Sequence, residues 1–492
     1  MSDKYILGID QSTQSTKALL FDSKGKILGR SDICHNQIIN DKGWVEHDPM
    51  QIYDNTITVA RNVIEKAAIN KSDIIGIGLT NQRETAVVWD RETGLPLYNA
   101  IVWQCARGAG ICERLINKSA LIHKKTGLNL SPYFSAAKIA WIIENVEQAK
   151  DKSEAGTLAY GTMDSWLLYK LSDGKRFKTD YSNASRTQLF NIRELKWDDE
   201  ICNLFGINKA CLAEVCDSNS NFGDTDLEGL FDMPIPIHSI LGDSHGALFG
   251  QECHKKGMAK ATYGTGSSIM MNIGEEAIFS EKGIVTSLAW GIDGQVSYVL
   301  EGNINYTGAV ISWLKNDLGL IQSETETEAL SYEANPSDKT CLVPAFSGLG
   351  APYWDSKARA IISGMTRTTG KAEIVRAALE SIAYQINDII SVMIKESGIR
   401  IKELRVDGGP TRNKFLMQFQ SDILNSIIHV PDVEELSVVG ASYMAGIAMG
   451  LFDEKVFKGL DYNSFNPLML NKDRMEKCEN WKRAIDTVLY KS

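Results

Sequence analysis

Hydrophobic residues recur along the chain in short runs that end at charged side chains, a pattern typical of strands in α/β proteins. Tyr5–Ile9 is such a run and ends at Asp10, and a second run, Ala18–Phe21, follows a polar loop. The two runs predict a β-hairpin. The loop amides and hydroxyls, with Lys17 beside them, suit phosphate oxygens, and a carboxylate at the base suits hydrated Mg²⁺. An ordinary hairpin with a polar turn has the same pattern.

The same arrangement returns in the second half of the chain. Ala259–Tyr263 and Ile269–Ile273 predict two strands, and residues 264–268 between them form a loop of small and hydroxyl-bearing residues. This weak internal repeat predicts two related halves that face each other. A boundary near residues 250–257 gives two domains, residues 1–250 and residues 251–492, and the chain after Asp461 is expected to form a helical tail.

Helical spacing and capping residues predict the main helices. Asp48 is suited to cap an amphipathic helix that begins at Pro49 and runs to Ala68. The clearest helix is Ala372–Ser397, with Gly398 as its terminating residue. Further helices are expected from Tyr133, over Tyr306–Leu318 and over Val438–Leu451.

Polar side chains follow several of the predicted strands. These strands are Ile74–Thr80, Val87–Asp90, Ala100–Trp103, Pro234–Leu241 and Leu404–Val406. Arg83 and Glu84 follow the first, Asp243 the fourth, and Asp407 with two glycines the last. Open α/β sheets bind ligands at these strand ends, and a Gly-Gly turn lets the backbone approach a nucleotide. Taken singly, Asp243 also suits a helix N-cap, and the glycines suit a plain turn.

Composition narrows the class of protein. The 492 residues exceed the usual size of one core, so at least two domains are expected. The formal charge of −10 disfavours nucleic-acid and anionic-membrane partners. No apolar stretch is long enough to insert into a membrane, and the N-terminus lacks a signal-peptide profile. The nine cysteines are scattered without a CxxC pair, as expected for reduced thiols of a cytoplasmic protein.

Together, the acid-bearing strand ends, the two loops and the Gly-Gly turn fit ATP-dependent phosphoryl transfer. The chain resembles the FGGY carbohydrate kinases, and within them the branch that phosphorylates glycerol. Tyr133–Asn145 matches the first family signature, and Ala360–Glu380 resembles the second. Further matching segments are Gly43–Met50, Asn81–Thr85, Ile101–Cys105, Asp180–Thr187, Phe346–Trp354, Arg405–Gly409 and Phe415–Leu424. The resemblance implies two actin-like (ribonuclease H-like) domains with a cleft between them.

The resemblance also implies roles for individual residues. Asp243 would be the general base, and the polyol would be held by Arg83, Glu84, Trp103, Tyr133 and Asp243, with Ser244 and Ser268 lining its pocket. ATP would be held by Thr13, Gln14, Lys17, Thr265, Gly266, Gly308, Ser312, Gly409 and Asn413. Asp10, with Asp243 nearby, would position Mg²⁺. The expected partners are ATP and a small polyol, and the resemblance implies a homodimer or homotetramer.

Several positions depart from the glycerol-phosphorylating pattern. That pattern usually has Gly-Thr-Thr at residues 12–14, arginine at Lys17, glutamine at Ser244 and an aromatic residue at Ser268. The last two changes fall in the expected substrate pocket. Two substrates therefore stay open: glycerol, and a polyol or ketose of four or five carbons. A non-catalytic actin-like nucleotide-binding or assembly protein is a third alternative, and Asp10 with Asp243 argues against it.

Overall fold

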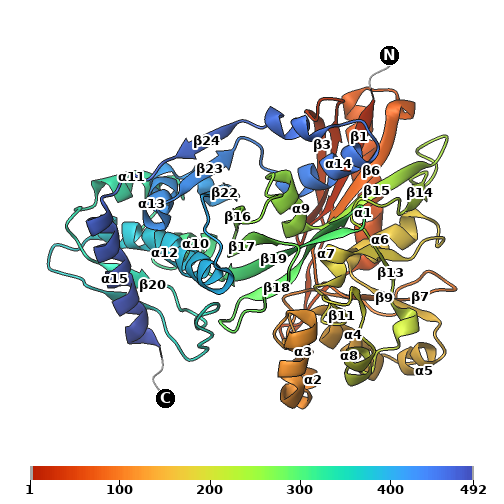
Figure 1. The fold of residues 1–492 in the computed structure, drawn as a ribbon, viewed down its shortest axis with the longest axis horizontal. Coiled ribbons are helices and arrows are strands. Elements are labelled where there is room, and N and C mark those ends of the chain that lie inside the picture. Colours follow the sequence, from red (N-terminus) through yellow and green to blue (C-terminus); the bar gives the residue numbers. More distant parts are fainter. Residues whose placement is uncertain (1–3, 490–492) are drawn as a thin grey trace.

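The computed structural model describes residues 4–489, which contain two large β-sheets (Figure 1). The six-stranded sheet has the order β14 (Gly223–Thr225), β15 (Ile235–Gly242), β6 (Ile74–Asn81), β1 (Tyr5–Gln11), β2 (Ser15–Phe21) and β3 (Ile27–Cys34). The seven-stranded sheet has the order β18 (Val285–Ile292), β19 (Gln295–Ile304), β17 (Ser267–Gly274), β16 (Ala259–Tyr263), β22 (Glu403–Asp407), β23 (Ile427–Pro431) and β24 (Tyr462–Phe465).

The two sheets share one topology. In the first, β1, β2 and β3 are antiparallel neighbours, while β6 and β15 continue on the other side of β1 as parallel strands. In the second, β16, β17 and β19 are antiparallel neighbours, and β22 and β23 continue beyond β16 as parallel strands. The internal repeat and the α/β fold class are confirmed. The domain division at residue 250 stays a prediction.

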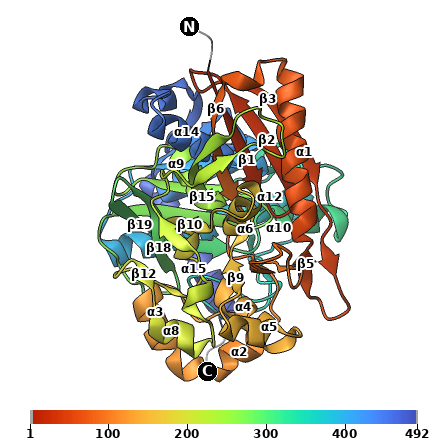
Figure 2. The same ribbon diagram turned by 90° about the vertical axis from the view of Figure 1, so that its right-hand side faces the viewer.

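The first sheet is covered on both faces, which explains its continuous apolar strands. Leu7 and Ile9 of β1 pack in a core with the helix α1 (Pro49–Ala67), which lies along β2 and β3 (Figure 2). Ile6 faces the other way, into a core with α14 (Leu436–Ala448). The side chain of Asp48 caps α1, as predicted, by accepting a hydrogen bond from the Met50 amide.

Helix α14 comes from the far end of the chain but packs on the first sheet (Figure 1). The approach is close enough that a Cβ at Gly8 would lie 2.2 Å from the Ser442 hydroxyl, and one at Gly78 would lie 2.5 Å from the Ala441 carbonyl oxygen. The glycines of the strands and the small residues of α14 therefore permit this contact. The two halves are joined through it.

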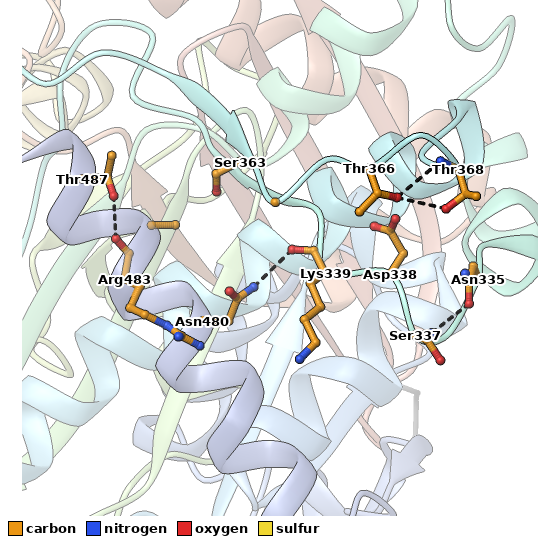
Figure 3. A pocket seen from close by; sticks show the side chains of 12 residues that line it. Asn335, Ser337, Asp338, Lys339, Ser363, Thr366, Thr368, Asn480, Arg483 and Thr487 are labelled. Carbon is orange, nitrogen blue, oxygen red and sulfur yellow. Dashed lines mark hydrogen bonds between the residues drawn. The ribbon is translucent and has the colours of Figure 1, made fainter.

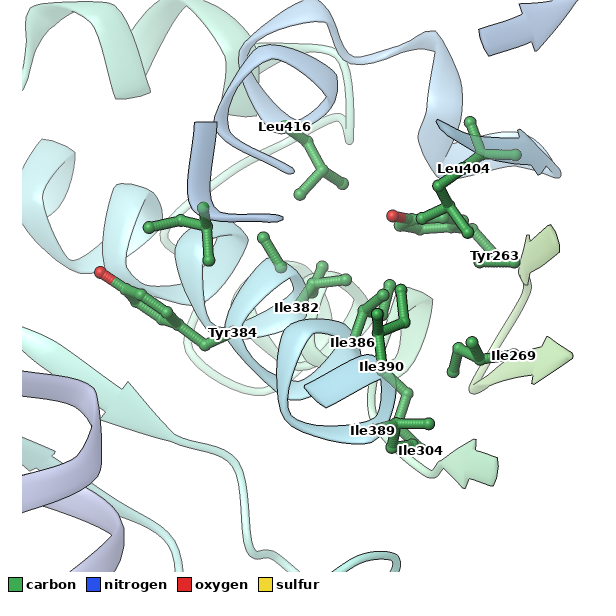
Figure 4. Close-up of a cluster of buried hydrophobic side chains, with 14 of the residues drawn as sticks. Tyr263, Ile269, Ile304, Ile382, Tyr384, Ile386, Ile389, Ile390, Leu404 and Leu416 are labelled. Carbon is green, nitrogen blue, oxygen red and sulfur yellow. The ribbon is translucent and has the colours of Figure 1, made fainter. Parts of the chain in front are cut away.

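The second core surrounds α12 (Lys371–Ser397), the clearest helix in the sequence (Figure 4). Ile382, Ile386 and Ile389 lie on its buried face and are fully buried. Truncating one such side chain to alanine typically costs about 2–5 kcal/mol. Gly398 ends the helix in the left-handed region at φ 68°, as predicted.

The remaining helices of the first half are α2 (Ala109–Arg114), α3 (Ser119–Thr126), α4 (Ser135–Asn145), α5 (Ala149–Glu154), α6 (Met163–Leu171), α7 (Tyr181–Ala184), α8 (Asp199–Leu204) and α9 (Asp243–Gly250). The second half adds α10 (Gly308–Asn316), α11 (Glu326–Glu333), α13 (Lys414–Leu424) and α15 (Asn471–Val488). Short strands include β4 (Ile38–Ile39), β5 (Val45–His47), β7 (Val87–Asp90), β8 (Ala100–Ile101), β9 (Leu158–Gly161), β10 (Lys178–Asp180), β11 (Phe190–Asn191), β12 (Lys196–Trp197), β13 (Glu214–Cys216), β20 (Cys341–Val343) and β21 (Ile361–Ser363).

The predicted helical tail is wrong in its first part. Tyr462–Phe465 is the strand β24, which pairs with β23 and completes the second sheet. Its backbone groups find partners on the edge of β23, an interaction that helical periodicity cannot reveal. Only α15 forms the helix of the tail. Over the described part of the chain, all nine cysteines are free and no helix has the length and hydropathy needed to cross a membrane.

Candidate active site

Several of the predicted site residues lie at, or directly after, the carboxyl ends of parallel strands in the two sheets. Strands β1, β6 and β15 are parallel neighbours that end at Gln11, Asn81 and Gly242. Strands β16 and β22 are parallel neighbours that end at Tyr263 and Asp407. The loops that follow these strands therefore gather at one edge of each sheet, the usual place for ligands in open α/β sheets.

Asp10 is a buried carboxylate next to the first phosphate-type loop. Its side chain lies 3.8 Å from Lys17 Nζ, and its Oδ1 atom has no hydrogen-bond partner among the described residues. Burial raises the pKa of Asp10 to about 7, because lost hydration outweighs the attraction of Lys17, and Asp243 adds to the increase. An unpartnered buried carboxylate oxygen suits a cation.

Lys17 has a second partner that the sequence did not indicate. Its Nζ donates to Glu435 Oε2 at 2.8 Å, and Arg30 Nη1 lies 2.8 Å from Glu435 Oε1. Glu435 is the residue immediately before α14, so the C-terminal part of the chain orients a predicted phosphate-binding lysine.

Arg83 and Asp243 contact each other directly. Arg83 Nε donates to Asp243 Oδ1 at 3.0 Å, and Arg83 Nη2 donates to the Ser244 hydroxyl at 3.2 Å. The alternative role of Asp243 as a helix cap is wrong: Gly242 is the N-cap and Asp243 is the first residue of α9. The Asp243 side chain is 35% exposed whereas that of Arg83 is 5% exposed, so the carboxylate is accessible to a small molecule.

Glu84 sits in a strained backbone conformation beside Arg83. Its φ is 58°, in the left-handed region that non-glycine residues seldom occupy, and such strain clusters at functional sites. Arg186 Nε donates to Glu84 Oε1 at 2.6 Å. Burial raises the pKa of Glu84 even though Arg186 and Arg83 oppose the shift.

Glu301 and Arg186 are site residues that the sequence analysis did not select. Glu301 accepts hydrogen bonds from Arg83 and is completely buried on β19. The sequence does contain a sign that Glu301 is functional: it directly follows Val299 and Leu300, so a charged residue lies within an apolar strand. Arg186 lies in a segment that resembled the family, yet its sequence context does not reveal its partner.

Trp103, Tyr133 and Thr13 form one wall of the site. The ring centroids of Trp103 and Tyr133 are 5.5 Å apart at an interplanar angle of 61°. Trp103 Nε1 donates to Thr13 Oγ1 at 3.0 Å, which ties the wall to the first loop. Lys138, fully buried, donates to the carbonyl oxygens of Pro132 and Phe134 and so holds the segment that presents Tyr133. Gln14, in contrast, is exposed at the loop tip.

The second loop is joined to the start of α10. The Gly308 amide donates to the Gly264 carbonyl at 2.9 Å, and the Ala309 amide donates to the Thr265 carbonyl at 3.0 Å. A Cβ at Gly308 would lie 2.9 Å from the Gly264 carbonyl oxygen, so glycine permits this close contact. Thr265, Gly266 and Gly308 are thereby brought together, and Ser312 is exposed one turn further along α10.

The Gly-Gly turn adjoins this second loop. Gly408 has φ 99°, and a Cβ there would lie 2.0 Å from the Tyr263 carbonyl oxygen. Gly409 is exposed and begins a short 3₁₀ helix, Gly409–Arg412, which leads into α13. Asn413 caps α13 by accepting from the Leu416 amide, and its Nδ2 donates to Thr327 Oγ1 at 3.0 Å. Glycine at residue 408 is thus required for the turn.

Ser268 lies on the second-sheet side of the site. It pairs with Asn303 across β17 and β19, and Asn303 Nδ2 lies 3.4 Å from Glu301 Oε1. Within residues 4–489, the Ser268 hydroxyl is buried without a hydrogen-bond partner. The Ser244 hydroxyl, in contrast, accepts a hydrogen bond from Arg83. Of the two serines, Ser268 is the one whose hydroxyl lacks a hydrogen-bond partner in the part of the chain that the structure describes.

The described residues contain no group of three or more His, Cys, Asp or Glu side chains placed to hold a metal. The assignment of Asp10, with Asp243 nearby, to Mg²⁺ stays a prediction; few protein carboxylates are enough where nucleotide phosphates and water supply most of the ligands. A separate cavity of about 710 Å³ lies between α15 and the loops around Lys339 and Thr366 (Figure 3). It contains none of the predicted site residues.

Known protein families and individual proteins are similar to this chain over nearly its full length. Models of the FGGY family of carbohydrate kinases match residues 5–250 with the N-terminal domain and residues 259–449 with the C-terminal domain. The glycerol kinase of Thermoanaerobacter sp. (strain X514) is 49% identical over 99% of both chains. The crystal structure of Plasmodium falciparum glycerol kinase with ADP superposes with a TM-score of 0.94 at 38% identity, covering 100% of this chain and 99% of that one. The ligand-bound xylulose kinase of Lactobacillus acidophilus shares the fold, with a TM-score of 0.87 at 22% identity over 99% of this chain and 97% of its own.

Proposed function

The chain belongs to the FGGY family of carbohydrate kinases, and we propose that it transfers the terminal phosphoryl group of ATP to glycerol, giving glycerol 3-phosphate. The observation that carries this proposal is the pairing of Arg83 with an accessible Asp243 carboxylate at 3.0 Å. The close glycerol kinase relatives support the choice of substrate. Family membership argues against a non-catalytic assembly protein.

The polyol would lie between the aromatic wall and the charged residues. Arg83 and Glu84 offer a donor and an acceptor to neighbouring hydroxyls, while Trp103 and Tyr133 cover the carbon chain. Asp243 would accept the proton of the attacking hydroxyl as the phosphoryl group arrives. Because phosphoryl transfer needs little covalent help, positioning of the two substrates is the main task of these residues.

ATP would lie across both loops, with its phosphates between the halves. Thr13, Gln14 and Lys17 would approach the phosphates from the first sheet, and Thr265 and Gly266 from the second. Gly308, Ser312, Gly409 and Asn413 would contact the rest of the nucleotide. Asp10 would hold Mg²⁺, which, when bound, neutralises charge on the phosphoryl oxygens. The unpartnered Oδ1 of Asp10 supports this assignment.

A coupled assay of ADP release tests the proposal. The purified protein is supplied with Mg·ATP and, in separate reactions, glycerol, erythritol, threitol, pentitols and ketoses. We expect glycerol to stimulate ADP release with the highest kcat/KM in the panel. ADP release that no polyol or ketose changes would refute the kinase assignment, and a clear preference for another compound would refute the choice of glycerol.

A four- or five-carbon polyol or ketose is the second candidate substrate. The observation that favours it is the buried Ser268 hydroxyl, which has no protein partner in the described structure. A serine in place of an aromatic side chain leaves room, and a further substrate hydroxyl would satisfy it. A cytoplasmic location, predicted from the sequence, and a homodimeric or homotetrameric state, implied by the family resemblance, accompany the proposal as predictions.

A further inference from the structure

The arginine assigned to the polyol is anchored by the opposite half of the molecule. Arg83 follows β6 of the first sheet, whereas Glu301 belongs to β19 of the second. Arg83 Nη1 donates to Glu301 Oε2 at 2.9 Å and Nη2 donates to Oε1 at 3.1 Å. This is a bidentate pair, the geometry that most strongly fixes the plane of a guanidinium.

Most N–H donors of Arg83 already have partners within the protein. A guanidinium has five N–H donors, and two of them go to Glu301, one to Asp243 and one to Ser244. One N–H on Nη1 remains for a substrate hydroxyl, together with the Nη2 hydrogen that Ser244 can release. Glu301 therefore decides in which direction the available donors point.

The same carboxylate contacts the residue that orients Glu84. Arg186 Nη1 lies 3.0 Å from Glu301 Oε2, and Arg186 Nε donates to Glu84 Oε1 at 2.6 Å. Arg186 is 1% exposed and Glu301 is 0% exposed, so solvent does not screen these contacts. Burial alone would raise the pKa of Glu301, but Arg186 and Arg83 hold it well below its usual value. Glu301 thus remains ionised between two guanidiniums.

We propose that Glu301 is a positioning residue for the polyol: from the second sheet it sets Arg83 directly, and Glu84 through Arg186, in the geometry that grips the substrate hydroxyls. The inference rests on the proposed function of Arg83 and Glu84. The polyol site then needs both halves of the molecule. The first half supplies the side chains that bind the hydroxyls, and Glu301 of the second half orients these side chains. Polyol binding then depends on the relative placement of the two sheets.

The test uses Glu301→Gln, which keeps the shape of the side chain and removes its charge. We expect the KM for glycerol to rise at least about tenfold, the loss typical of one hydrogen bond to a charged group, with the KM for ATP within about twofold of wild type. Glu301→Asp keeps the charge and should recover part of the affinity. If Glu301→Gln fails to fold, Glu301→Asp is measured alone and should raise the glycerol KM in the same direction.

Glu380→Gln is the matched control. Glu380 is also a buried glutamate of the second half with two cationic partners, Arg376 at 2.8 Å and Lys477 at 3.1 Å, but it does not contact Arg83. Its substitution should reduce stability and leave the glycerol KM unchanged. A role for Glu301 limited to stability would make the two variants behave alike.

A double-mutant cycle gives the sharpest readout. Glycerol affinity, measured by calorimetry, is compared for wild type, Glu301→Gln, Arg83→Lys and the double variant. If Glu301 acts partly through Arg83, its loss changes affinity by a clearly smaller factor once Arg83 has been replaced, and the remaining effect is the part carried by Arg186 and Glu84. Full additivity, or an unchanged glycerol KM in Glu301→Gln, would overturn the inference. Absence of glycerol turnover by the wild type would instead overturn the proposed function, so the two failures are distinguishable.

Discussion

Replacing Asp10 by Asn should stabilise the folded protein above neutral pH while it removes activity. Asp10 is 4% exposed, its Oδ1 atom lacks a partner in the described structure, and Lys17 is 3.8 Å away. Burial therefore opposes ionisation more than Lys17 favours it, and the pKa rises from 3.8 to about 7. The ionised form of Asp10 is therefore destabilised in the free protein, and a bound cation would stabilise it.

The sign and size of the effect follow from this shift. The unfolded chain loses the Asp10 proton near pH 3.8, whereas the folded protein keeps it until about pH 7. Stability therefore falls as pH rises between these values and is level above them. A shift of about three pKa units corresponds to about 4 kcal/mol at 1.36 kcal/mol per unit. Asparagine has no proton to lose, so Asp10→Asn should gain up to about 4 kcal/mol over wild type at pH 8 and much less at pH 5.

Urea denaturation at pH 5 and pH 8, without divalent cations, measures this difference. Asp54→Asn, at an exposed carboxylate on α1, is the control and should show no such pH dependence. Adding Mg²⁺ with a non-hydrolysable nucleotide should narrow the gap at pH 8, because a cation stabilises the ionised form. An Asp10→Asn variant that is no more stable than wild type at pH 8 would refute the reasoning.

Four further outcomes are expected. Asp243→Asn should lower kcat about 10²-fold or more with an unchanged unfolding midpoint, and near-full kcat would remove Asp243 from the role of general base. Gly408→Ala should raise the KM for ATP at least about tenfold in steady-state kinetics, because the new Cβ meets the Tyr263 carbonyl oxygen at 2.0 Å; an unchanged KM would contradict the tight-turn argument. Ser244→Gln combined with Ser268→Phe should shift kcat/KM towards glycerol and away from pentitols, and no shift would rule out the enlarged pocket. Small-angle scattering should show a smaller radius of gyration when polyol and a non-hydrolysable nucleotide are both bound, and an unchanged radius would count against closure of the halves.

Local features of the sequence were sufficient for much of the fold. The first hairpin, α1 and α12 were predicted because periodicity, caps and turns are short-range signals. Strand ends such as Asp10 and Asp243 were selected because parallel strands bring their carboxyl ends to one edge. The specific roles of Trp103 and Tyr133 came from the family resemblance, since an isolated aromatic residue is usually part of a core.

The contacts that organise the site could not be predicted in this way. Arg83 and Glu301 are 218 residues apart in the sequence, and Lys17 and Glu435 are 418 residues apart. No local pattern links such pairs, because they meet only when the two sheets and α14 pack together. The strand β24 was missed for the same reason: its partner β23 is supplied by tertiary structure.

The most direct test of the central claim is to identify the product. The protein is incubated with Mg·ATP and glycerol, and phosphorus NMR quantifies ADP and glycerol 3-phosphate over time, with Asp243→Asn as the parallel control. The account predicts one glycerol 3-phosphate for each ADP, and almost none of either from the variant over the same period. ADP without glycerol 3-phosphate, or equal product from Asp243→Asn, would contradict it.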